Sequence, residues 1–311
     1  MSDLHVIEAD GSQAADVVDV IHSAFGARAV LDPPSTAVHE SKESVRAALS
    51  RDGGLLTLVD AQPAGALLFG PSPGGLSLRR VSVHPRFQHR GVASAMVGVA
   101  EEVADRRGAA CVRLGARIEL PSTHRFWERR GYVEVGREGQ HIEYAKALPF
   151  EVATSSPENT HDIGRRIAEV LRAGDLVLLT GELGSGKTTF AQGLGAGLHV
   201  VGPVTSPTFI IARVHASAEA GPALVHVDAY RLGGVTELDD LDLDAALDEA
   251  VTVVEWGEGL AEGLSSERLE ISLTRTGTDE DVRTVRVIPV GARWVSGELR
   301  AAVVAVPTWS G

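Results

Sequence analysis

The stretch LVLLTGELGSGKTTF, residues 176–190, decides the fold of the second half of this chain. It opens with a short apolar run that is typical of a buried strand. The next eight residues, GELGSGKT (181–188), match the phosphate-binding pattern G-x-x-x-x-G-K-[ST] at every fixed position. A buried strand that leads into such a loop and then into an amphipathic helix predicts an α/β domain that binds phosphate groups.

Each residue type in this loop has a physical reason to be there. Gly181, Gly184 and Gly186 let the backbone bend so that successive N–H groups point at phosphate oxygens, and the positive end of the following helix adds to that field. We expect Lys187 to neutralise the β- and γ-phosphates and the hydroxyl of Thr188 to ligate Mg²⁺. Lysine is rare in this chain, with three lysines against 26 arginines, so Lys187 favours this function over a loop that merely turns the chain.

Two carboxylates extend the predicted site. HVDAYRL (226–232) places Asp228 at the end of a mostly apolar strand, and VTVVEW (251–256) places Glu255 at the end of another. A carboxylate at the tip of a buried strand beside a phosphate loop suits Mg²⁺ or the attacking water, although each alone is as often a solvated strand end. Trp256 or Tyr230 could face the nucleotide base, or either could be an exposed packing aromatic.

The order of these motifs resembles the TsaE family, the ATPase subunit of the tRNA threonylcarbamoyladenosine-modifying machinery. The resemblance rests on ENTHDIG (158–164), GELGSGKTTF (181–190), VTSPTF (204–209), HVDAYRL and VEW (254–256), and it covers about 140 residues. It implies a P-loop NTPase domain. The sequence itself predicts a hairpin of strands at 208–215 and 223–227, so we expect the sheet of this domain to be mixed. In that family the ATPase does not itself modify tRNA. It binds the TsaB and TsaD subunits, and its hydrolysis supports repeated cycles of N6-threonylcarbamoyladenosine formation at position 37.

The resemblance also implies roles for individual residues. ATP contacts are implied for Thr160, Gly181, Gly184, Ser185, Gly186, Lys187, Thr188, Thr189, Thr208 and Trp256. Thr208 is implied to act as a switch-like nucleotide sensor. Metal binding is implied for Thr188, Asp228 and Glu255, and catalysis for Lys187, Asp228 and Glu255. Glu182 and Ser185 replace the Asp and Ala more usual in the family, and neither is expected to disturb phosphate binding.

The charge of the second half bears on its partners. Residues 150–311 carry 12 Lys+Arg against 24 Asp+Glu, and such a surface repels nucleic-acid backbones, so we expect tRNA to be reached only through partner proteins. The acidic stretch at 237–250 is either a partner-docking face or the solvated side of an amphipathic helix. A small-molecule P-loop kinase, fused to a non-catalytic acetyl-coenzyme A-binding domain, remains the alternative. It would need a lid with arginines, and residues 190–250 contain only Arg213 and Arg231.

The first half carries a second motif. A strand predicted at 76–83 leads into QHRGVAS (88–94), where a helix begins, and HRFWERRGY (124–132) follows. Both segments resemble the GNAT N-acetyltransferases, which implies that Gly91 lets the backbone approach the coenzyme A pyrophosphate at a helix N-terminus. The strand would pair with the pantetheine arm. The implied acetyl-coenzyme A contacts are Val81, Val83, His89, Arg90, Gly91, Val92, Ala93 and Ser94.

This half departs from the GNAT pattern at one catalytic position. The tyrosine that usually protonates the leaving thiolate corresponds to Trp127, which cannot do so, and Tyr132 occupies a position that normally packs. Glu119 or His124 could act as acid or base, or have ordinary structural roles. Acetyl-coenzyme A binding is therefore better supported than catalysis, and the acceptor cannot be read.

The organisation of the chain follows from these motifs. We expect an N-terminal GNAT-like α/β domain at 1–148 and a C-terminal P-loop NTPase domain at 149–311. Cys111 is the only cysteine, so no intrachain disulfide can form, which suits a reducing cytosol. The N-terminus MSDLHVIEAD lacks the apolar core of a secretory signal, and the longest apolar stretches fall far short of the roughly 20 residues that span a bilayer. We therefore expect a cytoplasmic protein without membrane contact.

Overall fold

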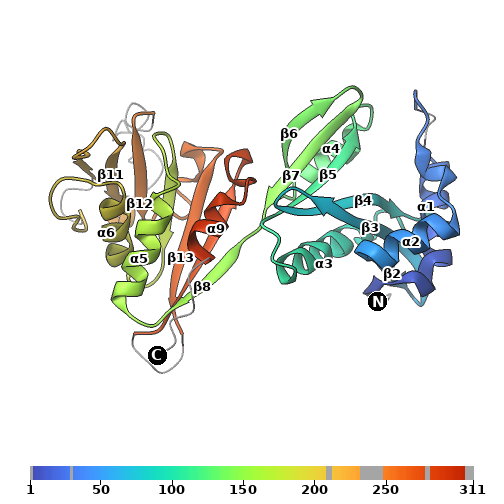
Figure 1. Ribbon diagram of the computed structural model, residues 1–311, viewed down its shortest axis with the longest axis horizontal. Coiled ribbons are helices and arrows are strands. Elements are labelled where there is room, and N and C mark those ends of the chain that lie inside the picture. Colours follow the sequence, from blue (N-terminus) through green and yellow to red (C-terminus); the bar gives the residue numbers. More distant parts are fainter. Residues whose placement is uncertain (1–2, 29–30, 208–211, 232–247, 277–280, 305–311) are drawn as a thin grey trace. The chain divides into compact units, whose positions relative to one another are not determined.

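The computed structural model describes residues 3–28, 31–207, 212–231, 248–276 and 281–304 (Figure 1). The chain divides into two compact units, Met1–Leu148 and Pro149–Gly311. Each unit is an α/β structure with its own mixed sheet. No helix in the described ranges is long and apolar enough to cross a membrane.

The first unit is built on a seven-stranded sheet in the order β1-β2-β3-β4-β5-β7-β6. Its strands are β1 (Leu4–Ala9), β2 (Gly54–Val59), β3 (Gln62–Ser72), β4 (Gly75–Val83), β5 (Cys111–Arg117), β6 (Val133–Glu138) and β7 (His141–Ala147). The β4–β5 pair is parallel, whereas the other neighbouring strands are antiparallel.

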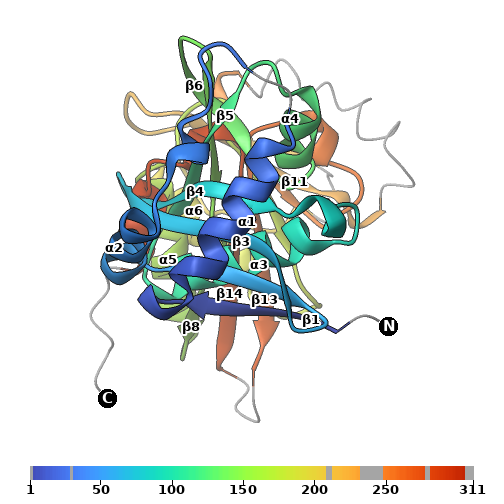
Figure 2. The same cartoon turned by 90° about the vertical axis from the view of Figure 1, so that its right-hand side faces the viewer.

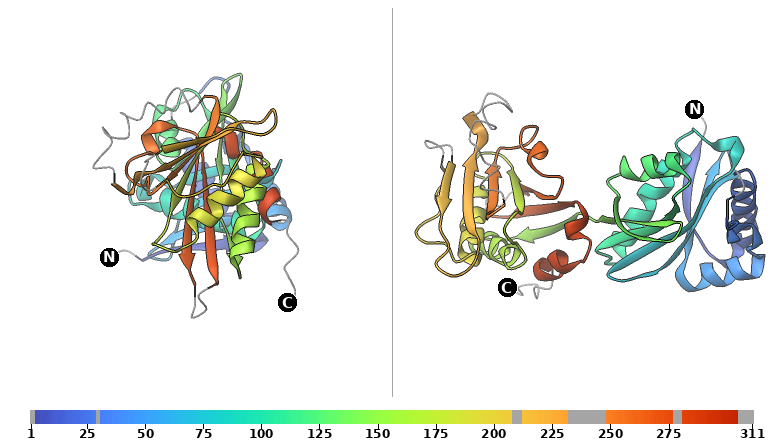
Figure 3. Two further views of the ribbon diagram at one scale, coloured as in Figure 1. Left: turned by 90° about the vertical axis from the view of Figure 1, so that its left-hand side faces the viewer. Right: turned by 90° about the horizontal axis from the view of Figure 1, so that it is seen from above.

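Helices cover both faces of this sheet. The helices are α1 (Ala14–Gly26), α2 (Lys42–Asp52), α3 (Val92–Arg106) and α4 (Pro121–Glu128). Because successive strand residues point to opposite faces, Leu56 and Leu68 pack with α1 and α2, while Leu55 and Leu67 pack with α3. Figures 2 and 3 show α1 and α2, in blue, on one face and α3, in teal, on the other. Burial on both faces explains why β2 and β3 are apolar at consecutive positions.

The parallel strands β4 and β5 stay paired over only part of their length. Residues Gly75–Leu78 pair with Cys111–Leu114, and beyond that point the described pairing of β4 is with β3 alone. A register shift in the β3–β4 pair accompanies Arg80, whose φ of 53° is in the left-handed region. The end of β4 therefore has a free edge toward β5.

The second unit has a seven-stranded sheet in the order β10-β11-β12-β9-β13-β14-β8. Its strands are β8 (Phe150–Thr154), β9 (Leu176–Thr180), β10 (Ala212–His215), β11 (Ala223–Asp228), β12 (Ala250–Glu255), β13 (Arg268–Arg275) and β14 (Arg283–Val290). The four central strands are parallel, and β10, β14 and β8 run antiparallel to their neighbours. The predicted mixed sheet is confirmed. The predicted strand at 208–215 is β10, and its first four residues lie outside the described ranges.

The helix that follows the glycine-rich loop is held by close backbone contact. It is α6 (Lys187–Gly197), and it packs beside α5 (Pro157–Ala168), as Figure 1 shows. A Cβ built on Gly193 would lie 2.0 Å from the carbonyl oxygen of His161, and one built on Gly164 would lie 2.4 Å from that of Phe190. Only glycines permit this approach. Near the C-terminus, α9 (Glu298–Val304) packs on α5 and β8.

Candidate functional site

The glycine-rich loop of the second unit joins β9 to α6 and is tightly curved. Gly181, Gly184 and Gly186 have φ values of 140°, 75° and 105°. These values favour glycine because a side chain would clash with its own backbone. Gly186 is also the N-cap of α6 and has no side chain to satisfy the first N–H groups of the helix. These donors are available to an anion.

Lys187 lies on the inner side of this loop. Its ammonium donates hydrogen bonds to the carbonyl oxygens of Gly181 (2.8 Å) and Glu182 (3.0 Å), and it lies 4.0 Å from the centre of the Trp256 ring. Burial lowers the pKa of Lys187, and the charges of Glu255 and Asp228 only partly oppose that shift. A buried ammonium held by neutral carbonyls gains from a phosphate that approaches the loop.

The two predicted carboxylates lie side by side at the ends of parallel strands. Asp228 ends β11, Glu255 ends β12, and the two residues are register partners. Asp228 accepts hydrogen bonds from Ser206 Oγ (3.2 Å) and the Tyr230 amide (3.1 Å). Glu255 accepts one from Nε2 of the buried His226 (3.0 Å). Each carboxylate therefore has a fixed orientation.

These groups converge on one cavity of about 580 Å³. Its lining includes the predicted residues Gly184, Gly186, Lys187, Thr188, Thr189, Asp228, Glu255 and Trp256, together with Leu183, Ser206 and Tyr230. Two carboxylates and the Thr188 hydroxyl form an all-oxygen donor set, which fits Mg²⁺ because that ion keeps several water and phosphate ligands. Among the residues that the structure describes, no three His, Cys, Asp or Glu side chains form a self-sufficient metal site.

Three other predicted ATP residues, all among the described residues, do not line this cavity. Thr160 is buried, and its hydroxyl lies 3.1 Å from Thr154 Oγ1 and 3.3 Å from the Ser156 carbonyl oxygen. Gly181 lines a neighbouring cavity with Trp256, and Ser185 is buried in the loop. Thr208 lies outside the described residues.

Two residues that contact the site were not predicted from the sequence. His226 has a sequence signal, because residues two apart in a strand share a face and His226 precedes Asp228 by two. Arg275 has none. Its guanidinium donates to the Gly184 carbonyl oxygen (3.1 Å) from β13, which comes next to the loop only because β13 pairs with β9.

The first unit has its own candidate site where α3 begins. Gly91 is the N-cap of α3 with a φ of 81°, and no side chain caps the helix. A cavity of about 920 Å³ opens in front of it. Of the predicted acetyl-coenzyme A contacts, it is lined by Val81, Val83, His89, Gly91, Val92, Ala93 and Ser94. Arg90 is not part of the lining, and its guanidinium lies 5.5 Å from the centre of the Phe87 ring.

The predicted acid–base candidates are engaged away from this cavity. Glu119 accepts hydrogen bonds from Arg117 (2.5 and 3.1 Å), which hold the pKa of Glu119 below its usual value. His124 contacts the Tyr144 hydroxyl (3.0 Å) and the Ile118 carbonyl oxygen (3.2 Å). Neither side chain lines the cavity.

Trp127 does line the cavity, and its ring meets that of Tyr132 edge-on with 5.0 Å between centres. Burial strongly raises the pKa of Tyr132. A buried phenol with a raised pKa is a poor source of protons for a thiolate, so Tyr132 acts in packing.

Comparison with known proteins gives a separate result for each unit. The family model "Threonylcarbamoyl adenosine biosynthesis protein TsaE" matches residues 154–285, and the model "Acetyltransferase (GNAT) family" matches residues 26–132. The tRNA threonylcarbamoyladenosine biosynthesis protein TsaE of Streptomyces coelicolor is 57% identical over 141 residues, which cover 44% of this chain and 95% of that protein. The protein of the same name from Bacillus subtilis is 38% identical, over 45% of this chain and 86% of its own length.

Solved structures give a weaker likeness. A Thermoplasma acidophilum PaiA N-acetyltransferase in complex with coenzyme A aligns with a TM-score of 0.43 and 15% identity, over 47% of this chain and 99% of that one. The family assignment therefore rests on the sequence relatives. Through its second unit this chain belongs to the TsaE family, and its first unit matches the GNAT acetyltransferase family.

Proposed function

We propose that residues 149–311 form a P-loop ATPase that binds and hydrolyses Mg-ATP in support of N6-threonylcarbamoyladenosine formation at position 37 of tRNA. It would act in the cytoplasm with TsaB- and TsaD-like partners, and tRNA would be contacted through them. The observation that carries this proposal is the convergence of Lys187, Thr188, Asp228 and Glu255 on one cavity at the start of α6.

The residues that line the cavity have distinct roles in this proposal. Lys187 exchanges its two carbonyl partners for the β- and γ-phosphates, and the N–H groups at the start of α6 hold the remaining oxygens. Thr188, Asp228 and Glu255 would hold Mg²⁺, which spreads the phosphate charge. Glu255, kept in place by His226, faces the cavity and orients the attacking water. Trp256 and Tyr230, whose ring centres lie 5.2 Å apart, form an aromatic wall for the nucleotide.

Reconstitution tests this proposal directly. Purified partner subunits are assayed for tRNA threonylcarbamoylation with no added chain, with wild-type chain and with Lys187→Ala. We expect repeated turnovers only with the wild type. Multiple turnovers with Lys187→Ala would overturn the assignment, because the variant lacks the ammonium that the phosphates require.

The kinase alternative makes a different chemical prediction. A kinase transfers the γ-phosphoryl group to an added nucleoside or metabolite, whereas this proposal expects slow hydrolysis that partners stimulate. Arg213, one of the two arginines in the region where a lid would lie, donates to Thr205 Oγ1 (3.0 Å). Segment 232–247 lies outside the described residues, so phosphoryl transfer to a panel of acceptors decides between the two.

For residues 1–148 we propose that acetyl-coenzyme A binds in the large cavity and that its acetyl group passes to an amine. The uncapped N-terminus of α3 supports binding of the pyrophosphate, and the free edge of β4 supports pairing with the pantetheine arm. Calorimetric titration of the full chain with acetyl-coenzyme A tests binding. Absence of binding would overturn this part without touching the ATPase.

A further inference from the structure

The cavity of the first unit reaches both faces of the sheet. The start of α3, on one face, lines it at Gly91–Ser94. Ala24 and Arg28, at the end of α1 on the opposite face, line the same cavity. The two walls meet because β4 and β5 are no longer paired beyond Leu78 and Leu114. A coenzyme that enters along α3 would therefore present its acyl group to a second ligand coming from the α1 side.

The charges that line this cavity are all of one sign. Arg28, Arg125, Arg129 and Arg130 contribute guanidinium groups, and the lining contains no aspartate or glutamate. Arg130 already contacts Ser94 Oγ and donates to the Phe126 carbonyl oxygen (3.0 Å), beside the helix N-terminus proposed for the pyrophosphate. Arg28 is set apart from this group, because it belongs to the α1 wall.

Arg28 has no carboxylate partner among the residues that the structure describes. Its guanidinium lies 4.1 Å from the centre of the Phe25 ring. Arg28 is exposed to solvent, and the atoms packed around its guanidinium lower the pKa of that group. The undescribed residues of this unit, Met1, Ser2, Ala29 and Val30, have no acidic side chains.

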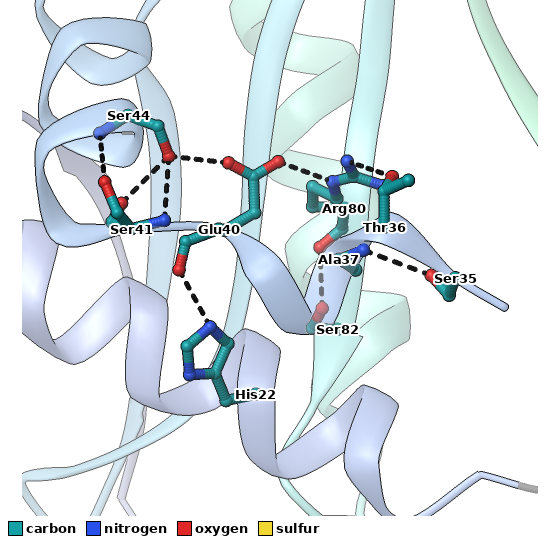
Figure 4. Close-up of polar contacts among 9 residues, drawn as sticks. All are labelled: His22, Ser35, Thr36, Ala37, Glu40, Ser41, Ser44, Arg80 and Ser82. Atoms are coloured by element: carbon teal, nitrogen blue, oxygen red, sulfur yellow. Dashed lines mark hydrogen bonds and ion pairs between the residues drawn. The ribbon is translucent and has the colours of Figure 1, made fainter.

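Two carboxylates of this unit, Glu40 and Glu119, are already paired with other arginines. Figure 4 shows Glu40 accepting hydrogen bonds from Arg80 Nε (2.9 Å) and Ser44 Oγ (2.7 Å), while Arg80 also donates to Thr36 Oγ1 (3.0 Å). Glu119 is bound in the same way by Arg117. The Glu40–Arg80 pair holds the segment after α1 against β4, and Arg28 lines the cavity.

We propose that Arg28 binds the carboxylate of the acetyl acceptor, and that the acceptor is a small primary amine that also carries a carboxylate, such as an amino acid. This inference rests on the proposed acetyl-coenzyme A function. The amine nitrogen attacks the thioester carbonyl carbon, the C–N bond forms and the C–S bond breaks. Coenzyme A leaves as the thiolate, and the proton lost by the amine reaches the thiolate through solvent. A polyamine fits poorly, because no carboxylate lines the cavity to receive its second cation.

The test compares acceptors that differ only in the carboxylate. The full chain is incubated with acetyl-coenzyme A and each proteinogenic L-amino acid, its amide and the corresponding decarboxylated amine, and release of coenzyme A is measured. Binding of the N-acetyl amino acids and their amides to the coenzyme A complex gives a second readout. We expect the carboxylate forms to exceed their amides by roughly 10- to 100-fold in kcat/KM or in affinity, the range for one charge-assisted hydrogen-bonded pair.

Variants separate the role of Arg28 from that of the coenzyme site. Arg28→Gln should remove the carboxylate preference through KM while acetyl-coenzyme A affinity stays unchanged, and Arg28→Lys should restore part of it. Arg137→Gln, a surface change on β6 outside the cavity, is the matched control. The inference is overturned if amides or polyamines are acetylated as efficiently as the amino acids, or if only a protein is acetylated. It is also overturned if neither kcat/KM nor affinity distinguishes the carboxylate from the amide, or if Arg28→Gln weakens coenzyme binding instead. If the wild-type chain does not bind acetyl-coenzyme A at all, the proposed function of the first unit is overturned instead.

Discussion

Gly193→Ala in the second unit has two opposite effects on stability: a gain in helix propensity and a steric clash with α5. Gly193 lies inside α6, where alanine is favoured over glycine by about 1 kcal/mol of helix propensity. The added Cβ would, however, lie 2.0 Å from the His161 carbonyl oxygen and 3.1 Å from the Arg165 amide nitrogen. Both atoms belong to the backbone of α5 and cannot rotate away. The two helices must therefore separate by about 1 Å before the contact becomes tolerable.

The magnitude follows from this forced separation. Overpacking typically costs 1–3 kcal/mol, and a backbone contact belongs at the upper end, so about 3 kcal/mol of cost less about 1 kcal/mol of propensity leaves a net loss of about 2 kcal/mol. Because α6 begins at Lys187, we also expect weaker ATP binding.

A matched control lies in the first unit. Gly98 is an exposed position inside α3, and a Cβ built there meets nothing within 4 Å. Gly98→Ala should therefore stabilise its unit by about 0.5–1 kcal/mol. Urea unfolding, followed by hydrogen exchange of peptides from each unit, measures both changes separately. A Gly193→Ala protein as stable as the wild type would refute the close α5–α6 contact.

Substitutions at four further residues test the second unit. Lys187→Ala removes the ammonium inside the loop, and ATP affinity measured by calorimetry should fall by about 10- to 100-fold while acetyl-coenzyme A affinity is unchanged; equal ATP affinity would contradict the proposed site. Glu255→Gln should keep ATP binding within a few fold but lower the hydrolysis rate by roughly 10²-fold in a phosphate-release assay, because the amide cannot orient or activate water as the carboxylate does. His226→Leu leaves the Glu255 carboxylate buried without its hydrogen bond, so the second unit should lose about 1–3 kcal/mol in urea unfolding, and His226→Gln should lose less. Burial, with the charges of His226 and Arg213, lowers the pKa of His215 below its ordinary value of 6.5, so the unfolded chain binds this proton more readily. That contribution to stability is present above about pH 6.5 and is lost as the pH falls toward the folded-state pKa, and His215→Gln should flatten the profile over that range.

Much of the second unit could be predicted from local sequence. The strand, glycine-rich loop and helix within 176–190 depend on short-range rules: an apolar run forms a buried strand, glycines permit positive φ, and Lys187 begins the helix. Asp228 and Glu255 were predicted at strand ends for the same reason, and both strands end there. In the first unit, Gly91 at the start of α3 was expected in the same way, because its positive φ favours glycine.

Other features depend on which strands become neighbours. The pairing of β9 with β13 brings Arg275 to the loop, and the pairing of β11 with β12 brings His226 to Glu255. Thr160 carries a family motif, yet its hydroxyl bonds to Thr154 behind the loop. The residues around Arg28 in the sequence do not predict that it lines a cavity. It does so because β4 and β5 separate, which lets the end of α1 line the same cavity as the start of α3.

The sequence by itself determined the glycine-containing turns that precede α6 and α3, the positions of the carboxylates at strand ends and the mixed α/β character of the second unit, because steric limits and periodicity act over a few residues. Tertiary structure alone decided which side chains hold those carboxylates and which guanidinium groups line the cavity of the first unit. Strand order and register determine these neighbours. Both depend on the packing of a whole unit, so they cannot be deduced from a short stretch of sequence.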